Sequence, residues 1–160
     1  MALQHEMNIG INSDDRRVVA EGLARITAST YMLYLKTHGF HWNVTGMLSN
    51  NLHLMFEKQY TELWMSVDTL AERIRALGHF APHSARELSK LTLIQDAEVI
   101  PPAKEMIRQL TEGHELISRE SRKLYEATER CKDEATSNLL TERIQYHEKS
   151  AWMLRALIEE

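Results

Sequence analysis

The sequence predicts an all-α protein built around a bundle of four long helices, and three observations support this fold class. The chain has 160 residues, enough for one domain with a substantial hydrophobic core. It contains only six glycines and three prolines, the residues that most often interrupt helices. Apolar residues also recur three and four positions apart over four long segments. We therefore expect a single domain over 1–160, with a flexible N-terminal tail over 1–12.

The first two predicted helices are joined by a short turn. The first covers about residues 13–40, with Ser13 and Asp14 as candidate N-caps. The second covers about residues 49–77 and stops at Gly78. A turn of this length makes the two helices antiparallel neighbours. The apolar stripe of the second helix comprises Leu52, Phe56, Leu63, Val67, Leu70, Ile74 and Leu77.

The last two predicted helices form a second pair. The third follows Pro101-Pro102, and the fourth covers about residues 133–158 after a very short turn. The segment 78–102 between the second and third helices is long enough to cross the bundle. Within it, the sequence SARELSKL at 84–91 has helical spacing and predicts a short extra helix.

Composition narrows the classes of function. A formal net charge of -4 argues against a wholesale nucleic-acid-binding surface. The single Cys131 excludes an intrachain disulfide framework and a thiolate zinc cluster, so a metal would be held by His, Asp and Glu. Residues 1–15 lack the pattern of a secretion signal, and no stretch is apolar enough to span a membrane. We expect a cytoplasmic protein, with nucleoid association as a further possibility, and no membrane partner.

The second predicted helix carries a polar stripe beside its apolar one. The stripe comprises His53, Glu57, Tyr60, Trp64, Asp68 and Glu72. At about 100° per residue its histidine and acids share one face, but at about 1.5 Å rise per residue Glu57 and Asp68 stand roughly 16 Å apart along the axis. One helix therefore cannot close one site with both halves of the stripe. A stripe of surface ion pairs with Arg73 or Lys58 is the simpler alternative.

Two antiparallel copies of this helix would close a site. A two-fold axis near its middle would bring His53 and Glu57 of one chain to Asp68 and Glu72 of the other, with Tyr60 and Trp64 near the axis. His41 could join His53 across the short turn. Two imidazoles and three carboxylates suit Fe(II) and can also hold Zn, Co or Mn. The sequence has no Glu-x-x-His, so a diiron site inside one bundle is unsupported.

Several motifs together resemble the signature of the Dps mini-ferritins. They are HGFHWNVTG at 38–46, HLMFE at 53–57 and SVDTLAERIRALG at 66–78, and KSAWMLRAL at 149–157 resembles the family's terminal helix. The resemblance covers nearly the whole chain. It implies a ferritin-like four-helix bundle with a long crossover, assembled from two-fold dimers into a hollow homododecamer.

The resemblance also implies an activity and residues that carry it. His41, His53, Asp68 and Glu72 would be ferroxidase ligands, two from each of two subunits, and Glu57 stands as a metal ligand where many members have Asp. The protein would be an oxidoreductase acting on metal ions. It would oxidise two ferrous ions per site, preferably with hydrogen peroxide, and store Fe(III) mineral. Two neighbouring Fe(II) ions can deliver both electrons to one peroxide, so the same site would protect against oxidative damage.

Further residues gain expected roles from the family. Trp42 and Trp152 match tryptophans near the iron and are candidate radical sinks, although Trp42 could also simply pack the corner between the first two helices. Glu129, Asp133 and Glu134 cluster where the family lines a three-fold pore with acids, and solvated helix caps are the alternative for them. His114 and His147 lie on apolar helix faces, so we expect hydrogen-bonded core residues rather than metal ligands.

Two rival functions stay open. The first is a nucleoid-condensing protein in which DNA protection dominates, since the family is named for DNA binding. The tail MALQHEMNIGIN has no lysine, and Arg16 and Arg17 come only after two aspartates, which argues against direct DNA binding. The second is a scaffold bundle without metal, for which the polar stripe would be a solvated surface.

Overall fold

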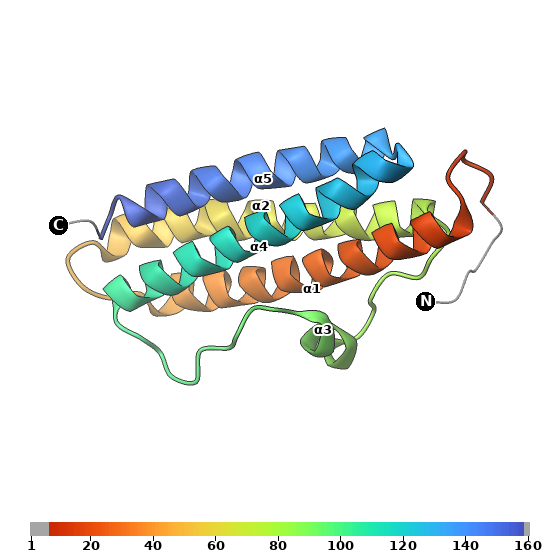
Figure 1. The fold of residues 1–160 in the computed structure, drawn as a ribbon. Helices are drawn as coiled ribbons and strands as arrows, with labels where there is room; N and C mark the ends of the chain where they lie inside the picture. Colours follow the sequence, from red (N-terminus) through yellow and green to blue (C-terminus); the bar gives the residue numbers. More distant parts are fainter. Residues whose placement is uncertain (1–6, 159–160) are drawn as a thin grey trace.

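The computed structural model describes residues 7–158, in which five helices form. They are α1 (Ser13–Asn43), α2 (Ser49–Ala76), α3 (Ala85–Leu91), α4 (Ala103–Cys131) and α5 (Glu134–Arg155). Helices α1 and α2 form one antiparallel hairpin, and α4 and α5 form the other (Figure 1). The crossover between the hairpins runs back along the bundle and carries the short α3 (Figure 1). The predicted all-α bundle and the short crossover helix are confirmed.

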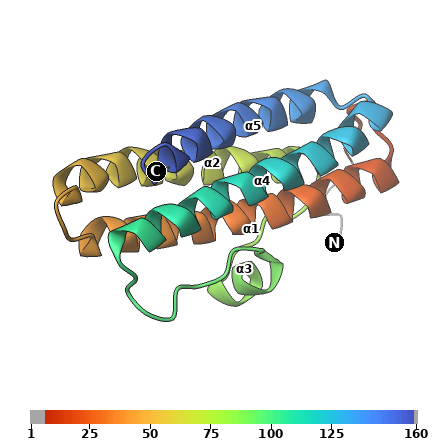
Figure 2. The ribbon, with the colours of Figure 1, turned by 60° about the vertical axis from the view of Figure 1, so that its left-hand side comes forward.

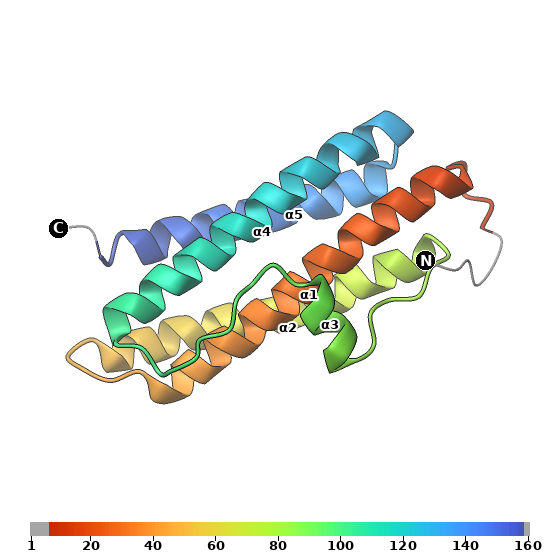
Figure 3. The same ribbon diagram turned by 60° about the horizontal axis from the view of Figure 1, so that its bottom comes forward.

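The two hairpins meet mainly through α1 and α4, while α2 and α5 touch only lightly. Figure 2 shows these four helices side by side from a second direction. The short α3 packs against α1 on the outside of the bundle, where Figure 3 shows the crossover passing along it. Because α2 packs closely only on α1, much of its outer surface stays exposed in the single chain.

Helix ends follow local hydrogen-bonding chemistry. Asn12 caps α1, accepting a hydrogen bond from the backbone N–H of Asp15 at 2.9 Å. The predicted caps Ser13 and Asp14 were therefore one and two residues too late, because Asn12 has the extended backbone of a cap and they already lie inside the helix. The predicted stop at Gly78 is confirmed, since Gly78 has φ +90°.

The α4–α5 turn is equally short. Lys132 adopts a left-handed conformation, φ 55° and ψ 41°, and the Asp133 N–H donates back to the Thr128 carbonyl at 2.9 Å. The Asp133 carboxylate then caps α5 by accepting from the Thr136 N–H at 3.0 Å. This turn reverses the chain in two residues and brings the end of α4 against the start of α5.

The core confirms the apolar stripe predicted for α2. All its members are buried except Val67, which is half-buried. Where α1 meets α4, each helix places a glycine under a leucine of the other, Gly22 below Leu124 and Gly113 below Leu33. A Cβ on Gly113 would lie 2.6 Å from Leu33 Cδ1. The hairpins can therefore approach this closely because glycine stands at both positions.

The two histidines on apolar faces lie in this core. His114 and His147 are fully buried, and their Nδ1 atoms are 2.9 Å apart in a hydrogen bond between α4 and α5. This confirms the expectation that they are hydrogen-bonded core residues.

The N-terminal tail predicted for 1–12 falls partly on residues 1–6, outside the described residues, and stays a prediction. In the part of the chain that the structure describes, no helix has the length and apolarity needed to cross a membrane.

Candidate metal centre

The short turn between α1 and α2 brings two histidines into contact. His41 lies in the last turn of α1 and His53 near the start of α2, and their rings stack with centroids 3.7 Å apart. His41 Nδ1 donates to the carbonyl oxygen of His53 at 2.8 Å, and His53 Nδ1 donates to the carbonyl oxygen of His41 at 2.9 Å. Each imidazole is therefore held in place by the backbone of the other residue.

These hydrogen bonds determine which nitrogen can bind a cation. A proton on each Nδ1 leaves the lone pair of a neutral imidazole on Nε2. Metal-binding histidines are commonly oriented in this way, by a hydrogen bond from the other ring nitrogen to a carbonyl. The pair His41 and His53 thus presents two nitrogen donors of the kind that transition metals bind.

The carboxylates of the polar stripe are exposed, but the chain does not bring them all to this pair. Glu57 follows His53 by one turn of α2 on the same face. Asp68 and Glu72 lie further along α2, and the helix rise places Asp68 roughly 16 Å from Glu57. Among the described residues, no three His, Cys, Asp or Glu side chains come together as a metal site. One chain therefore assembles the histidine half and leaves Asp68 and Glu72 apart from it.

The neighbouring cation does not neutralise this stripe. Arg73 binds Asp133 at 2.6 Å and Thr136 at 2.8 Å, which ties the end of α2 to the start of α5. Because Arg73 is engaged by these partners, the alternative that the polar stripe forms surface ion pairs with Arg73 is weakened.

Large apolar side chains interrupt the exposed face of α2 between its two acidic halves. Trp64 is 54% exposed and Met65 is 66% exposed. Beside them, Glu62 binds Arg143 of α5 at 2.5 Å, and burial raises the pKa of Glu62 although Arg143 opposes that shift. A helix face with exposed aromatic and thioether groups is typical of a surface that a partner covers.

One histidine in this region was missed by sequence reasoning. His38 stacks on Tyr60 with centroids 4.0 Å apart and lies 4.2 Å from the ring of Trp42. Desolvation, and then the neighbouring His41, lower the pKa of His38. The spacing of three residues between His38 and His41 puts both on one face of α1, and this signal could have identified it.

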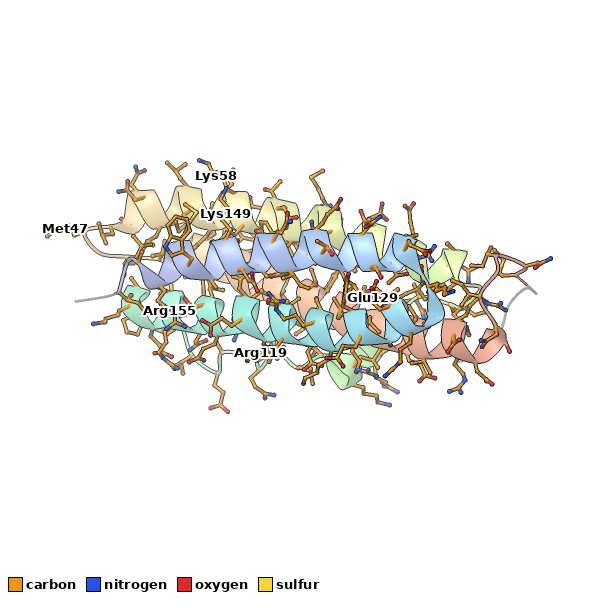
Figure 4. All side chains as sticks on the ribbon, turned by 45° about the horizontal axis from the view of Figure 1, so that its top comes forward. Met47, Lys58, Arg119, Glu129, Lys149 and Arg155 are labelled. Carbon is orange, nitrogen blue, oxygen red and sulfur yellow. The ribbon has the colours of Figure 1, made fainter. Side chains whose placement is uncertain are left out.

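The remaining predicted site residues occupy different places. Trp152 lies exposed on α5, outside the ring contacts around His41. Glu129, labelled in Figure 4, and Glu134 are exposed on either side of the α4–α5 turn. Asp133 is buried between them. Desolvation would raise its pKa, but hydrogen bonds from Thr136 and Arg73 outweigh it, and the pKa of Asp133 lies below its usual value.

Comparison with known proteins places this architecture in a class. The family model described as "Ferritin-like domain" matches residues 20–160 of this chain. DNA protection during starvation protein 2 of Bacillus anthracis is 35% identical over 142 residues, which cover 89% of this chain and 97% of that protein. The fold and sequence therefore define a ferritin-like protein.

Solved structures narrow the class to a family. The Dps protein of Vibrio cholerae O1, described as a member of a broad superfamily of ferritin-like diiron-carboxylate proteins, matches with a TM-score of 0.92 at 30% identity and covers 99% of both chains. A Dps protein from Bacillus brevis matches with a TM-score of 0.89 at 32% identity, covering 93% of this chain and all of that one. This chain belongs to the Dps family.

Proposed function

We propose that this protein is a ferroxidase and iron-storing mini-ferritin whose catalytic sites lie between two subunits. One observation carries the proposal: His41 and His53 are locked together with both Nε2 atoms free for a cation, while Asp68 and Glu72 stand exposed on α2 beyond their reach. One chain thus brings together the two histidine ligands of the proposed site, while its own Asp68 and Glu72 are exposed and lie apart from them.

A two-fold axis near the middle of α2 would unite the halves. Antiparallel packing of two α2 helices brings the histidine pair and Glu57 of one subunit to Asp68 and Glu72 of the next, and forms this site twice per dimer. The exposed Trp64 and Met65 would be buried near that axis, which removes apolar surface from water.

The chemistry follows from the donor set. Neutral imidazoles and ionised carboxylates suit ferrous ions, and the same set can hold Zn, Co or Mn. Glu72 is our candidate bridge between two ferrous substrates, because a carboxylate has two oxygens to share. Two adjacent ferrous ions supply two electrons to hydrogen peroxide, which with two protons becomes water without releasing a hydroxyl radical. Hydrogen peroxide is the oxidant that we propose.

Storage requires an enclosed space and an entrance. We propose a hollow dodecamer acting in the cytoplasm, with ferric product deposited inside. Glu129 and Glu134 are exposed and could line a three-fold pore, although Glu129 also accepts a hydrogen bond from the Ser137 hydroxyl at 3.2 Å, whereas Asp133 is buried and engaged by Arg73 and Thr136. Trp42 stands beside His41 as a radical sink, and Trp152 is assigned the same role by its match to the family motif.

Glu72→Ala tests the proposed site. The variant should slow peroxide-driven oxidation of Fe(II) by more than about tenfold, because it removes a ligand to the substrate ions. Stopped-flow absorbance measures the rate, and light scattering checks that the assembly keeps its size. Glu126→Ala, which removes an exposed acid from α4, is the matched control and should keep the wild-type rate. Wild-type oxidation by the Glu72 variant would exclude this assignment.

Protection of DNA by direct binding is the second candidate, favoured by the name of the Bacillus anthracis relative. The described surface argues against it. Arg16 is buried and donates to the Ile11 carbonyl, and Arg17 lies 3.6 Å from both Asp14 and Glu21. Lys58 of α2 and Lys149 of α5 line one hollow, whereas Arg119 and Arg155 lie elsewhere on the bundle and are paired with Glu115 (Figure 4).

We therefore expect no retarded band in a mobility-shift assay at neutral pH and moderate salt without divalent metal, since strong binding to phosphates needs clustered cations. A Dps protein that retards the same DNA serves as the positive control. A salt-sensitive shift with the present protein would favour the DNA-binding alternative.

A further inference from the structure

A hollow opens where helices α2 and α5 meet. The two helices touch only lightly, which leaves a seam between the hairpins (Figure 1). Two contacts close the middle of this seam: Glu62 pairs with Arg143 at 2.5 Å, and the Tyr146 hydroxyl donates to the carbonyl oxygen of Gln59 at 3.3 Å. From Tyr146 toward the end of α5, the seam widens into a hollow of about 400 Å³. This volume falls in the usual range of small-molecule sites.

The walls of the hollow are mainly aliphatic and thioether side chains. Leu54 and Met55 line it from α2, and Met153 lines it from α5. Leu54 is 49% exposed and Met153 is 42% exposed, so this apolar surface is open to water in the single chain. Methionine side chains are flexible and adapt to ligands of different shape. An apolar chain that covered these walls would remove them from water, which is favourable.

Two lysines line the same hollow, one from each helix (Figure 4). Lys58 and Lys149 are exposed, and neither makes an ion pair or a hydrogen bond with the residues that the structure describes. The acid one helical turn after Lys58 is Glu62, which already binds Arg143. Glu148, next to Lys149, is likewise held by an arginine of α4. The hollow therefore combines two uncompensated positive charges with an apolar surface.

A buried amide at the inner end of the hollow lacks a partner. Gln59 lines the hollow and is only 7% exposed, and its side-chain oxygen has no hydrogen-bond partner among the described residues. Buried polar atoms are rarely left unpaired, because losing the hydrogen bond is costly. Rotation of the amide by half a turn exchanges its oxygen and its NH2 group, and the NH2 group can then donate to an anion.

We propose that this hollow binds an aliphatic carboxylate of the fatty-acid class. The carboxylate lies between Lys58 and Lys149, within reach of the Gln59 amide, and the alkyl chain covers Leu54 and Met153. The two cations select an anion and the apolar walls select a chain, whereas inorganic phosphate would leave the walls in water. The histidine pair lies where α2 meets α1, so this binding is independent of iron and of the proposed ferroxidase function.

Isothermal titration calorimetry of the assembled protein tests the proposal. Sodium decanoate is the probe, used below the concentration at which it forms micelles, and we expect saturable binding of one decanoate per chain. Butyrate has too short a chain to cover the walls, and decyltrimethylammonium carries the opposite charge. Both should bind at least about tenfold more weakly than decanoate. Equal binding of decanoate and decyltrimethylammonium would overturn the proposal, because it would show that the lysines take no part.

Variants of the two lysines locate the binding. Lys58→Gln/Lys149→Gln should weaken decanoate binding by more than about tenfold, because it removes both charge-assisted hydrogen bonds to the carboxylate. Lys90→Gln/Lys123→Gln removes the same charge from α3 and α4, outside the hollow, and is the matched control that should keep the wild-type affinity. Equal weakening in both double variants would mean that decanoate responds to net charge alone, and it would refute this site.

A third variant tests the apolar wall and does not depend on the lysines. Leu54→Gln keeps both cations and replaces an exposed apolar side chain, so it should also weaken decanoate binding. Light scattering checks that each variant assembles like the wild type. If the Lys58 and Lys149 variant does not assemble, Leu54→Gln decides, and an unchanged affinity would overturn the proposal. Absence of decanoate binding to the assembled wild type, as when a neighbouring copy covers the hollow, would overturn it as well.

Discussion

His41 and His53 each donate from Nδ1 to a backbone carbonyl oxygen, whereas His114 and His147 share one hydrogen between their own Nδ1 atoms. In the first pair both imidazoles keep an Nε2 lone pair that is available to a cation. In the second, one ring must accept, so at least one imidazole has to be neutral. The same residue type thus serves as a candidate ligand near the surface and as a neutral core element inside.

The core pair predicts acid sensitivity. Burial lowers the pKa of His114 to about 3, and burial, His114 and Arg143 lower that of His147 well below its usual value. The unfolded chain binds these protons near pH 6.5 and the folded chain does not. Stability is therefore fully present above about pH 6.5 and is lost as pH falls toward about 3. We expect the thermal midpoint of the wild type to fall clearly between pH 7 and pH 5.

His114→Gln/His147→Gln provides the comparison, since glutamine is polar but does not titrate in this range. The variant should show a smaller fall in midpoint between pH 7 and pH 5, whatever its stability at pH 7. Measurements at one protein concentration keep the contribution of assembly constant. An equal fall in both proteins would mean that other groups carry the acid sensitivity.

At the scale of helices, the close approach of α1 and α4 predicts that a larger side chain at Gly22 lowers stability. A Cβ at Gly22 would lie 2.9 Å from Leu124 Cδ2 and closer still to Cδ1. Overpacking a core costs about 1–3 kcal/mol, which exceeds the roughly 0.5–1 kcal/mol that alanine gains over glycine in a helix. Gly22→Ala should therefore lower the thermal midpoint.

Gly39→Ala on the same helix is the matched control. A Cβ there meets nothing within 4 Å in the chain, so only the helix propensity changes and the midpoint should rise. Thermal unfolding at equal protein concentration measures both variants. If Gly22→Ala were as stabilising as Gly39→Ala, the leucine above it would have to relax at no cost, contrary to a tightly packed interface.

Most of the helical architecture could be predicted because its signals are local. The apolar stripe of α2 and the stop at Gly78 follow from periodicity and from the conformational freedom of glycine. The cap of α1 was misplaced because Asn12, Ser13 and Asp14 are all good capping residues, and sequence alone does not rank them. The capping residue is the one whose backbone is extended, and in this structure that residue is Asn12.

The contact between His41 and His53 could be predicted from the sequence, but its fine geometry could not, and the full set of site residues stays a prediction. Motifs and spacing identified His41 and His53, but their reciprocal bonds to each other's carbonyl oxygens depend on the path of the turn over residues 44–48. His38 was missed because the order of rings around Tyr60 is a tertiary property. The engagement of Asp133 was missed for the same reason, since its partner Arg73 comes from another helix.

At the scale of the whole molecule, the position of Asp68 and Glu72 makes the proposed centre a property of the assembly. Co-assembly of His53→Ala and Glu72→Ala chains tests this, because sites shared between two chains and sites within one chain predict different recovered fractions of activity. Each variant alone should be nearly inactive, since every site then lacks one ligand in either geometry. In random co-assembly about half of the dimers are mixed, and each mixed dimer has one intact site and one doubly broken site.

About a quarter of the wild-type sites should therefore return on mixing if a two-fold axis completes them. Stopped-flow oxidation of Fe(II) by hydrogen peroxide gives the recovered fraction. The two chains must be co-expressed with different tags and the mixed species purified through both, because homodimers that do not exchange would imitate a negative result. Sites that belonged to one chain would contain no intact ligand set in any mixture. Activity that stayed at the level of the separate variants after verified mixing would rule out the antiparallel pairing of α2, since one intact site per mixed dimer is its necessary consequence.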